Sequence, residues 1–278
     1  MIRLVTPSLE GRLFTAAPFL GPFGIKICSL YETYRQQPGV LDVWLLLDGQ
    51  AICGAVSRME SGGTIALIPG SQPDFDELAA FLPAAGLHWL DGMQETLSPL
   101  ASRIPSRMQL AAHMQYDPAL PPPDCPFAGQ IFPADRLSEV YPLLCAGQPG
   151  FARQVRYDSW LTETSHKLRH GQAEIWVLKV DSVSVSTVGI YFKAAGQALL
   201  AGLATLPAYR GRGYGQAMMA YATGQALREG LHPHLLTADA QILPFHAQCG
   251  YRPQGDWGRL FLCESKEQEG FSDDGTIF

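Results

Sequence analysis

The sequence is poor in charged residues and has no long apolar run. Charged residues make up 17% of the 278 residues, against 47% hydrophobic residues. No apolar stretch of about 18 residues could span a membrane, and the N-terminus lacks the charged start and apolar run of a signal peptide. We therefore expect a chain with a large buried core, no membrane partner and a cytoplasmic location.

Paired cysteine motifs are also missing. Structural zinc sites are commonly built from closely spaced cysteines, and no Cys-x-x-Cys pair occurs in this chain. We expect reduced thiols and no bound metal. The six cysteines are Cys28, Cys53, Cys125, Cys145, Cys249 and Cys263.

The net charge is low, at −6, and it is unevenly distributed along the chain. Residues 1–124 carry a net charge of −5, residues 125–263 carry +3, and the remaining tail carries −4. The mildly basic part suits a polyanionic ligand, whereas nothing in the pattern indicates nucleic acid as a partner.

The most informative stretch runs from 198 to 229. Residues 198–206 are small and apolar, which predicts a buried strand, and Pro207 ends it. The sequence Arg-Gly-Arg-Gly-Tyr-Gly follows at 210–215. Apolar residues then recur at helical spacing, and Gly230 stands where a helix would be capped.

A glycine-rich loop that opens a helix is suited to bind phosphate. The first N–H groups of a helix have no internal partner, and the helix dipole places partial positive charge there. Glycines let the backbone approach the phosphate oxygens, while arginines add charge. This predicts a pyrophosphate cradle made of Arg210, Gly211, Arg212, Gly213, Tyr214, Gly215 and Gln216.

Two common phosphate-binding motifs do not fit this loop. A dinucleotide fingerprint counted from Gly211 would need glycine where Gln216 stands, and the Gly-Lys-Ser/Thr of a P-loop is absent. Arg-x-x-Gly-x-Gly, preceded by Leu-Pro-x-Tyr at 206–209, resembles the acetyl-CoA loop of the GNAT superfamily of N-acetyltransferases. The alternative interpretation is a glycine-rich turn with two solvated arginines.

A proline-rich segment divides the chain. It includes Asp-Pro-Ala-Leu-Pro-Pro-Pro-Asp at 117–124, which can form neither a helix nor a strand ladder. We therefore predict one domain over 1–117, a linker over 118–126 and a second domain over 127–264. The acidic tail, 265–278, is expected to be disordered.

The same order of elements recurs on both sides of the linker. The predicted elements of the first half are strands at 41–47, 51–59 and 64–68, then a helix at 74–82 with Asp74 as its cap and Pro83 as its stop. Those of the second half are helices at 135–145 and 159–170, strands at 174–180, 183–192 and 197–206, and then the loop and helix. We predict an α/β fold of two tandem GNAT-like domains, each a mostly antiparallel sheet flanked by helices.

The region after Gly230 extends the resemblance. It predicts a strand at 235–238, a helix at 239–249 and a last strand at 258–264. GNAT proteins commonly carry an Asn, a Tyr and a closing Gly-Phe in this region. Here Gly250-Tyr251 matches the closing pair, Asp239 stands in place of Asn, and His246 in place of Tyr. The resemblance implies that Asp239 belongs to the cofactor site and that His246 is the general acid for the leaving thiolate.

The resemblance also assigns the third strand of the second domain. It implies that the backbone of Leu203, Ala204 and Thr205 bonds the pantetheine arm and the acetyl carbonyl. No glutamate lies on 197–206 to serve as a base, which leaves Glu163, Glu174, Tyr191 or water as alternatives.

The first half lacks the corresponding loop. Its residues 69–74, Pro-Gly-Ser-Gln-Pro-Asp, contain no arginine and no alternating glycines, and Asp74 and Asp76 would repel phosphate. We therefore expect a degenerate GNAT-like domain there.

The expected activity is acetyl transfer from acetyl-CoA, as co-substrate, to a small primary amine by direct attack in a ternary complex. The amine is expected in the cleft between the halves, where the net charge of the first half would favour a cationic acceptor. The main alternative is a non-catalytic acyl-CoA-binding or regulatory module, and a second is transfer of a longer acyl chain. An acyl-cysteine route through Cys249 and His246 is disfavoured because cysteines are so often buried.

Overall fold

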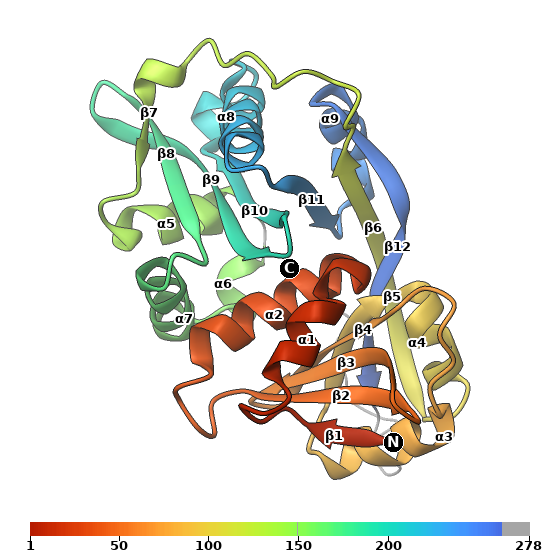
Figure 1. Cartoon of the computed structure of the whole chain (residues 1–278). Helices are drawn as coiled ribbons and strands as arrows, with labels where there is room; N and C mark the ends of the chain where they lie inside the picture. Colours follow the sequence, from red (N-terminus) through yellow and green to blue (C-terminus); the bar gives the residue numbers. More distant parts are fainter. Residues whose placement is uncertain (149, 263–278) are drawn as a thin grey trace. The chain divides into compact units, whose positions relative to one another are not determined.

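The computed structural model describes residues 1–148 and 150–262, which divide into two compact units (Figure 1). Of the described residues, unit 1 comprises 1–113 and 255–262, and unit 2 comprises 114–148 and 150–254. The sequence analysis places the last strand in the second domain, whereas residues 255–262, which form most of that strand, belong to unit 1. The predicted disordered tail, 265–278, lies outside the described residues.

Unit 1 begins with a strand and two helices that the sequence analysis does not anticipate. Its elements are β1 (Ile2–Leu4), α1 (Glu10–Ala16), α2 (Gly21–Tyr34), β2 (Asp42–Asp48), β3 (Ala51–Met59), β4 (Gly62–Leu67), α3 (Phe75–Ala84), β5 (Trp89–Met93), α4 (Gln94–Ala101) and β6 (Ser106–Tyr116). β6 crosses into unit 2.

The predicted helix cap of α3 is confirmed. The Asp74 carboxylate accepts hydrogen bonds from the N–H groups of Asp76 (3.0 Å) and Glu77 (2.9 Å). The predicted stop at Pro83 is wrong by a short margin, because the helix passes through this proline and ends at Ala84. So near the end of the helix, the proline removes one N–H bond without breaking a long run.

The sheet of unit 1 has the strand order β1-β2-β3-β4-β5-β12-β6. The β4–β5 pair is parallel and joins Gly62–Thr64 to Trp89–Asp91. Residues 257–261 of β12 (Tyr251–Leu262) pair antiparallel with β5. Helices α3 and α4 bury their leucines against one face of this sheet, so the C-terminal strand is part of the core of unit 1.

Unit 2 repeats the order of unit 1 with one additional short helix, α6. Its elements are β7 (Ile131–Pro133), α5 (Leu137–Gly147), α6 (Phe151–Gln154), α7 (Tyr157–Arg169), β8 (Glu174–Val180), β9 (Val183–Ala194), β10 (Gln197–Thr205), α8 (Tyr214–Arg228), β11 (His232–Thr237), α9 (Leu243–Gln248) and the start of β12. This repetition confirms the predicted tandem of related α/β folds.

The sheet of unit 2 is covered by helices on both faces. Successive β8 residues point to opposite sides: Trp176 packs with the helix α8, whereas Ile175 packs with the helices α5 and α7. Buried α8 residues such as Met218 and Ala222 complete the first face. The packing fixes the start of α8 near the end of β10, where the predicted loop lies.

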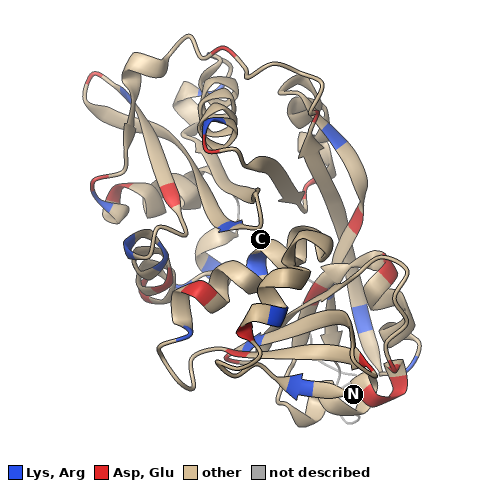
Figure 2. Cartoon of the chain, viewed as in Figure 1, with Lys and Arg blue, Asp and Glu red and all other residues tan. Residues whose placement is uncertain are grey.

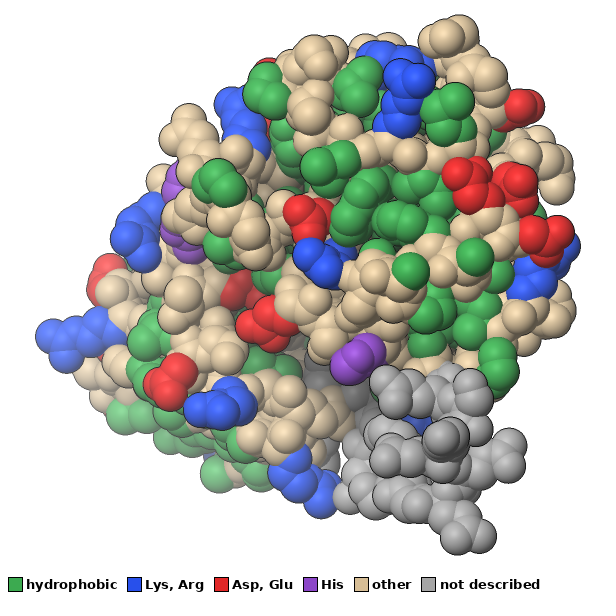
Figure 3. Space-filling view, turned by 90° about the horizontal axis from the view of Figure 1, so that it is seen from below, with side chains coloured by type: hydrophobic (Ala, Val, Ile, Leu, Met, Phe, Trp, Pro, Cys, Tyr) green, Lys and Arg blue, Asp and Glu red, His purple; other side chains and the backbone are tan. Residues whose placement is uncertain are grey.

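Charges of both signs are scattered over the chain. Figure 2 shows acidic and basic residues in both units, and in the face seen in Figure 3 they are interspersed with hydrophobic side chains. Among the helices of residues 1–148 and 150–262, none is long and apolar enough to cross a membrane.

Candidate functional site

Two neighbouring parallel strands separate in unit 2. β10 and β11 pair only from Gln197–Leu200 to His232–Leu235, although β10 continues to Thr205 and β11 to Thr237. Beyond Leu200, the backbone N–H and C=O groups along this edge of β10 are therefore not paired with β11. Such an edge can receive an extended chain by backbone hydrogen bonding.

A β-bulge lies in the same part of β10. The pairing with β9 shifts register between Ala201 and Ala204. Gly202 within the bulge has a φ of +68°, and a Cβ there would lie 2.9 Å from the Tyr191 hydroxyl. Only glycine therefore fits at this position without a shift of the ring or the strand.

The three predicted pantetheine-binding residues lie in the bulge (Leu203) and directly after it (Ala204 and Thr205). The Leu203 carbonyl accepts a long hydrogen bond of 3.4 Å from the side-chain amide of Gln148. The Ser186 hydroxyl donates to the Ala204 carbonyl at 2.8 Å and lies 2.8 Å from the Thr205 hydroxyl. These contacts hold the end of β10 in place beside the loop that follows.

The glycine-rich loop turns the chain from β10 into α8. Gly211 and Gly213 both have left-handed backbones, with φ of +75° and +82°. No side chain caps α8, and its first helical bond joins the Ala217 N–H to the Gly213 carbonyl at 3.0 Å. The N–H groups of residues 214–216 precede that bond and have no carbonyl within the helix. They are oriented as an anion site requires.

The two arginines of the loop are exposed and partly occupied by backbone carbonyls. Arg210 donates to the carbonyls of Thr205 (3.2 Å) and Gly147 (3.1 Å). Arg212 donates to the Ala208 carbonyl (3.2 Å), and its guanidinium lies 5.1 Å from the centre of the Tyr209 ring. Arg210 therefore braces the loop against the end of α5, while Arg212 is held only by its own turn.

The other two predicted residues, Asp239 and His246, lie before helix α9 and within it. Asp239 caps a short 3-10 helix before α9, because its carboxylate accepts from the Gln241 N–H at 2.8 Å. His246 is 5% exposed, and within the described part of the chain its Nδ1 has no hydrogen-bond partner. Burial lowers the pKa of His246 to about 4. The imidazole is therefore neutral at pH 7.

Cys249 is close to His246 in sequence but is unsuited to act as a nucleophile. Burial raises the pKa of its thiol to about 11. The thiolate is the reactive form of cysteine, and its population at neutral pH is correspondingly small. The protonation state therefore gives no support to an acyl-cysteine intermediate.

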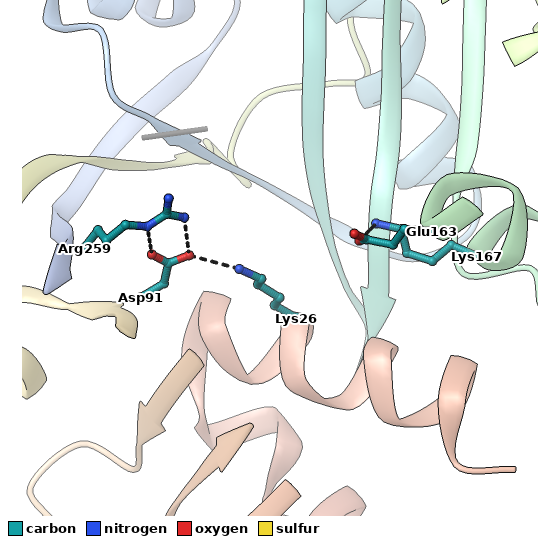
Figure 4. A network of polar contacts seen from close by, with 5 residues as sticks. All are labelled: Lys26, Asp91, Glu163, Lys167 and Arg259. Atoms are coloured by element: carbon teal, nitrogen blue, oxygen red, sulfur yellow. Dashed lines mark hydrogen bonds and ion pairs between the residues drawn. The ribbon is translucent and has the colours of Figure 1, made fainter. Parts of the chain in front are cut away.

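The three side chains considered as bases are all engaged. Glu174 forms an ion pair with Lys193, and Glu163 one of 2.8 Å with Lys167 (Figure 4). Burial raises the pKa of Tyr191 far above its usual range. The two carboxylates are therefore held by lysines, and the Tyr191 hydroxyl keeps its proton.

Some residues at the site had no signal in the sequence. Gly147 and Gln148 end the helix α5 and contact β10 and its loop from a distant part of the chain. Gly202 looks in the sequence like any small strand residue, and only the register shift identifies its role. A glycine within an apolar strand was the one available hint of a bulge.

Residues 137–251 match the family model described as the Acetyltransferase (GNAT) family. Several solved structures share the fold. A tandem GNAT protein from the clavulanic acid biosynthesis pathway superposes with a TM-score of 0.58 at 13% identity, over 94% of this chain and 98% of that one. A GCN5-related N-acetyltransferase from Kribbella flavida gives 0.56 at 16% identity, over 86% and 95% of the two chains.

An acetyltransferase from the GNAT family from Colwellia psychrerythraea gives a TM-score of 0.57 at 12% identity, over 95% and 100% of the two chains. At such identities the likeness concerns the fold. Among curated proteins, no sequence matches this chain.

Proposed function

We propose that this chain transfers the acetyl group of acetyl-CoA directly to a small primary amine in a ternary complex, because residues 137–251 match the model of the GNAT acetyltransferase family. The observation that carries the proposal is the joint placement of the splayed β10 edge and the uncapped start of α8. The β10 edge can take up the pantetheine arm, and the start of α8 can take up the pyrophosphate.

In this mechanism the residues of the loop and the strand bind and orient the thioester. The N–H groups at the start of α8 and Arg212 would hold the pyrophosphate, and the backbone of Leu203, Ala204 and Thr205 would hold the arm. The amine nitrogen attacks the thioester carbonyl, the C–S bond then breaks, and the thiolate leaves. A backbone N–H of the splayed edge, aimed at the carbonyl oxygen, would stabilise the developing oxyanion.

The ion pairs and protonation states of the candidate bases favour water as the base. The carboxylates of Glu163 and Glu174 are paired with lysines, and Tyr191 holds its proton strongly. The amine therefore loses its proton to water. His246 is neutral at pH 7 and would serve the leaving sulfur as an N–H hydrogen-bond donor rather than as an imidazolium acid. Replacing it with phenylalanine is expected to lower kcat about tenfold, with little change in KM for acetyl-CoA.

The decisive experiment is calorimetric titration of acetyl-CoA into the wild type and Gly213→Asp. An acidic side chain at the start of α8 would repel the pyrophosphate, so binding should be lost. Gly171→Asp is the matched control, since Gly171 also has a left-handed backbone (φ +69°) and nothing lies within 4 Å of its Cβ position. Failure of acetyl-CoA to bind the folded wild type would refute the proposal.

The acceptor is proposed to be cationic. Residues 1–124 carry a net charge of −5, which would attract a polyamine or aminoglycoside-like amine more strongly than a neutral one. The kcat/KM ratio between a cationic and a neutral amine should therefore fall as salt is raised from low to high. Equal rates for both classes at every ionic strength would contradict this preference.

A binding or regulatory module is the second candidate, because Glu163 and Glu174 are paired with lysines, Tyr191 holds its proton, and His246 is neutral. Binding of acetyl-CoA without turnover over a panel of amines would favour it. Parallel assays with acetyl-CoA and longer acyl-CoA thioesters distinguish acetyl transfer from transfer of a longer chain.

A further inference from the structure

Unit 2 contains a cavity beside the start of α8. Its volume is about 530 Å³, and Gly213 and Gln216 of the proposed pyrophosphate site are among its lining residues. The other walls are the segment 120–127, which we call the proline wall, and the C-terminal end of α9. The proline wall is the segment that the sequence alone presents as a spacer between domains.

The proline wall is packed against α8. The Phe127 ring lies 5.2 Å from that of Tyr214, the first residue of the helix. The Cys125 thiol donates to the Ala217 carbonyl at 3.3 Å. The Tyr116 hydroxyl donates to the Pro121 carbonyl at 2.7 Å. These contacts fix the wall along its length, so it can form one side of a preformed site.

The chemistry of coenzyme A decides which of its parts could reach this cavity. The pantetheine arm leaves the pyrophosphate on one side and the adenosine on the other. The arm is assigned to β10, and no β10 residue lines the cavity, whereas Gly213 and Gln216 do. We propose that the cavity receives the adenine of the acyl-CoA, with the proline wall as the outer side of the site. This inference rests on the proposed function.

The lining suits a neutral planar base. Prolines of the wall, the Tyr116 ring and the Phe127 ring supply flat apolar surface. The side-chain amides of Gln216 and Gln248 lie there 3.5 Å apart (Nε2 to Oε1) and offer the donors and acceptors that an adenine edge pairs with.

The charge of the lining argues for the base and against the phosphate. Among the described residues, no lysine or arginine lines the cavity, whereas Asp124 does. A carboxylate would repel the 3′-phosphate of coenzyme A but can accept a hydrogen bond from a ribose hydroxyl or from the adenine amino group. The 3′-phosphate is therefore expected outside the cavity.

The test compares acetyl-CoA with acetyl-4′-phosphopantetheine, which lacks the adenosine, its 3′-phosphate and one phosphate of the pyrophosphate, by calorimetry on the full chain. The wild type should bind acetyl-CoA at least about tenfold more tightly. Ala220→Trp places an indole in the cavity and should reduce this difference by weakening acetyl-CoA alone, while the part that is due to the missing phosphate remains. Ala128→Trp is the matched control, because Ala128 is exposed and does not line the cavity, and it should preserve the difference.

A second variant guards against misfolding of Ala220→Trp. Gln248 is exposed, so Gln248→Leu is expected to fold, and it should weaken acetyl-CoA by about threefold to tenfold without affecting the truncated thioester. Unchanged acetyl-CoA affinity in a folded Ala220→Trp, or in Gln248→Leu, would place the adenine elsewhere and overturn the inference while leaving the proposed function intact. A wild type that binds neither thioester would refute both.

Discussion

Asp91 is the most fully enclosed charged side chain among the described carboxylates of unit 1. It is 2% exposed, and it bonds Arg259 through both carboxylate oxygens (2.7 and 3.0 Å) and Lys26 at 3.1 Å (Figure 4). Burial alone would raise its pKa, but Lys26 and Arg259 together more than offset this and hold the pKa below its usual range. The three residues come from α2, β5 and β12.

Asp91→Asn should destabilise the protein strongly. The change leaves two partly buried cations without their counter-charge, and we expect a loss of about 3 kcal/mol in the free energy of unfolding. Urea denaturation followed by circular dichroism measures this loss. Asp76→Asn is the control, since Asp76 pairs with Arg103 on the surface, and it should cost less than about 1 kcal/mol. Equal losses of stability in the two variants would show that the buried Asp91 contributes no more than a surface ion pair.

His246 predicts a dependence of stability on pH. Its pKa is about 4 in the folded chain and about 6.5 when unfolded, so between these values only the unfolded chain takes up the proton. Stability from this group is therefore complete above pH 6.5 and is lost as the pH falls towards 4. Between pH 7 and pH 5 the loss should be about 2 kcal/mol smaller in His246→Gln than in the wild type.

Urea midpoints at the two pH values provide the measurement. His113, whose pKa burial also lowers to about 4, is present in both proteins and cancels in the comparison. Parallel pH profiles for the wild type and His246→Gln would show that His246 is already accessible to protons in the folded state.

At the scale of elements, the β10 bulge depends on one glycine. Gly202→Ala would need a positive φ and would place its Cβ 2.9 Å from the Tyr191 hydroxyl. We expect a loss of about 2 kcal/mol in stability and a larger KM for acetyl-CoA, because the end of β10 would shift. Thermal unfolding and steady-state kinetics test the two effects. An unchanged KM for acetyl-CoA in Gly202→Ala would show that the bulge does not shape the cofactor site.

In helix α8, in contrast, replacing a glycine should stabilise the protein. Gly224 lies inside the helix with a helical backbone, and its Cβ position meets only an Arg228 side-chain nitrogen, at 3.6 Å. Gly224→Ala should therefore stabilise the protein by about 0.5–1 kcal/mol, since alanine has the better helix propensity. A rise in the urea midpoint at unchanged acetyl-CoA affinity is the expected result. A fall would reveal a crowded contact at this face of the helix.

Local chemistry explains which elements the sequence predicts. Pro207 and the glycines after it mark the end of β10 and the start of α8, and the Asp74 carboxylate caps α3, because these residues act on their own neighbours in the chain. Helix α2 is harder to recognise, since nearly all of its residues are buried and no polar face gives it a period. β5 is also hard to recognise, because Asp91 and Gly92 lie at its centre and both residue types are uncommon in strands.

The site is predictable to the same extent. The loop at 210–215 has a motif and is found at the start of α8, but the contacts of Gly147 and Gln148 with β10 arise only from packing. The burial of His246 is likewise a property of the folded unit. A pattern of residues can identify a position in α9, but the pKa of a side chain there depends on what surrounds it.

At the scale of the whole molecule, unit 1 depends on β12, a strand far from the rest of the unit in sequence. Residues 257–261 pair with β5, and Arg259 neutralises Asp91. A chain ended after Gln254 should therefore lose protection of the β5 amides against hydrogen exchange, because their antiparallel partner is gone. Hydrogen-exchange mass spectrometry of the truncated and full chains makes the comparison. Retained protection of residues 89–93 would show that β5 does not need β12.

The division of the chain at residues 113 and 255 has a consequence for engineering. Unit 1 is discontinuous in sequence and unit 2 is a continuous segment within it, so the second copy of the fold behaves topologically as an insertion. A chimera that joins two relatives at the proline wall would give each product a foreign last strand. Grafts should instead exchange 114–254 as one cassette, with both junctions cut inside β6 and β12.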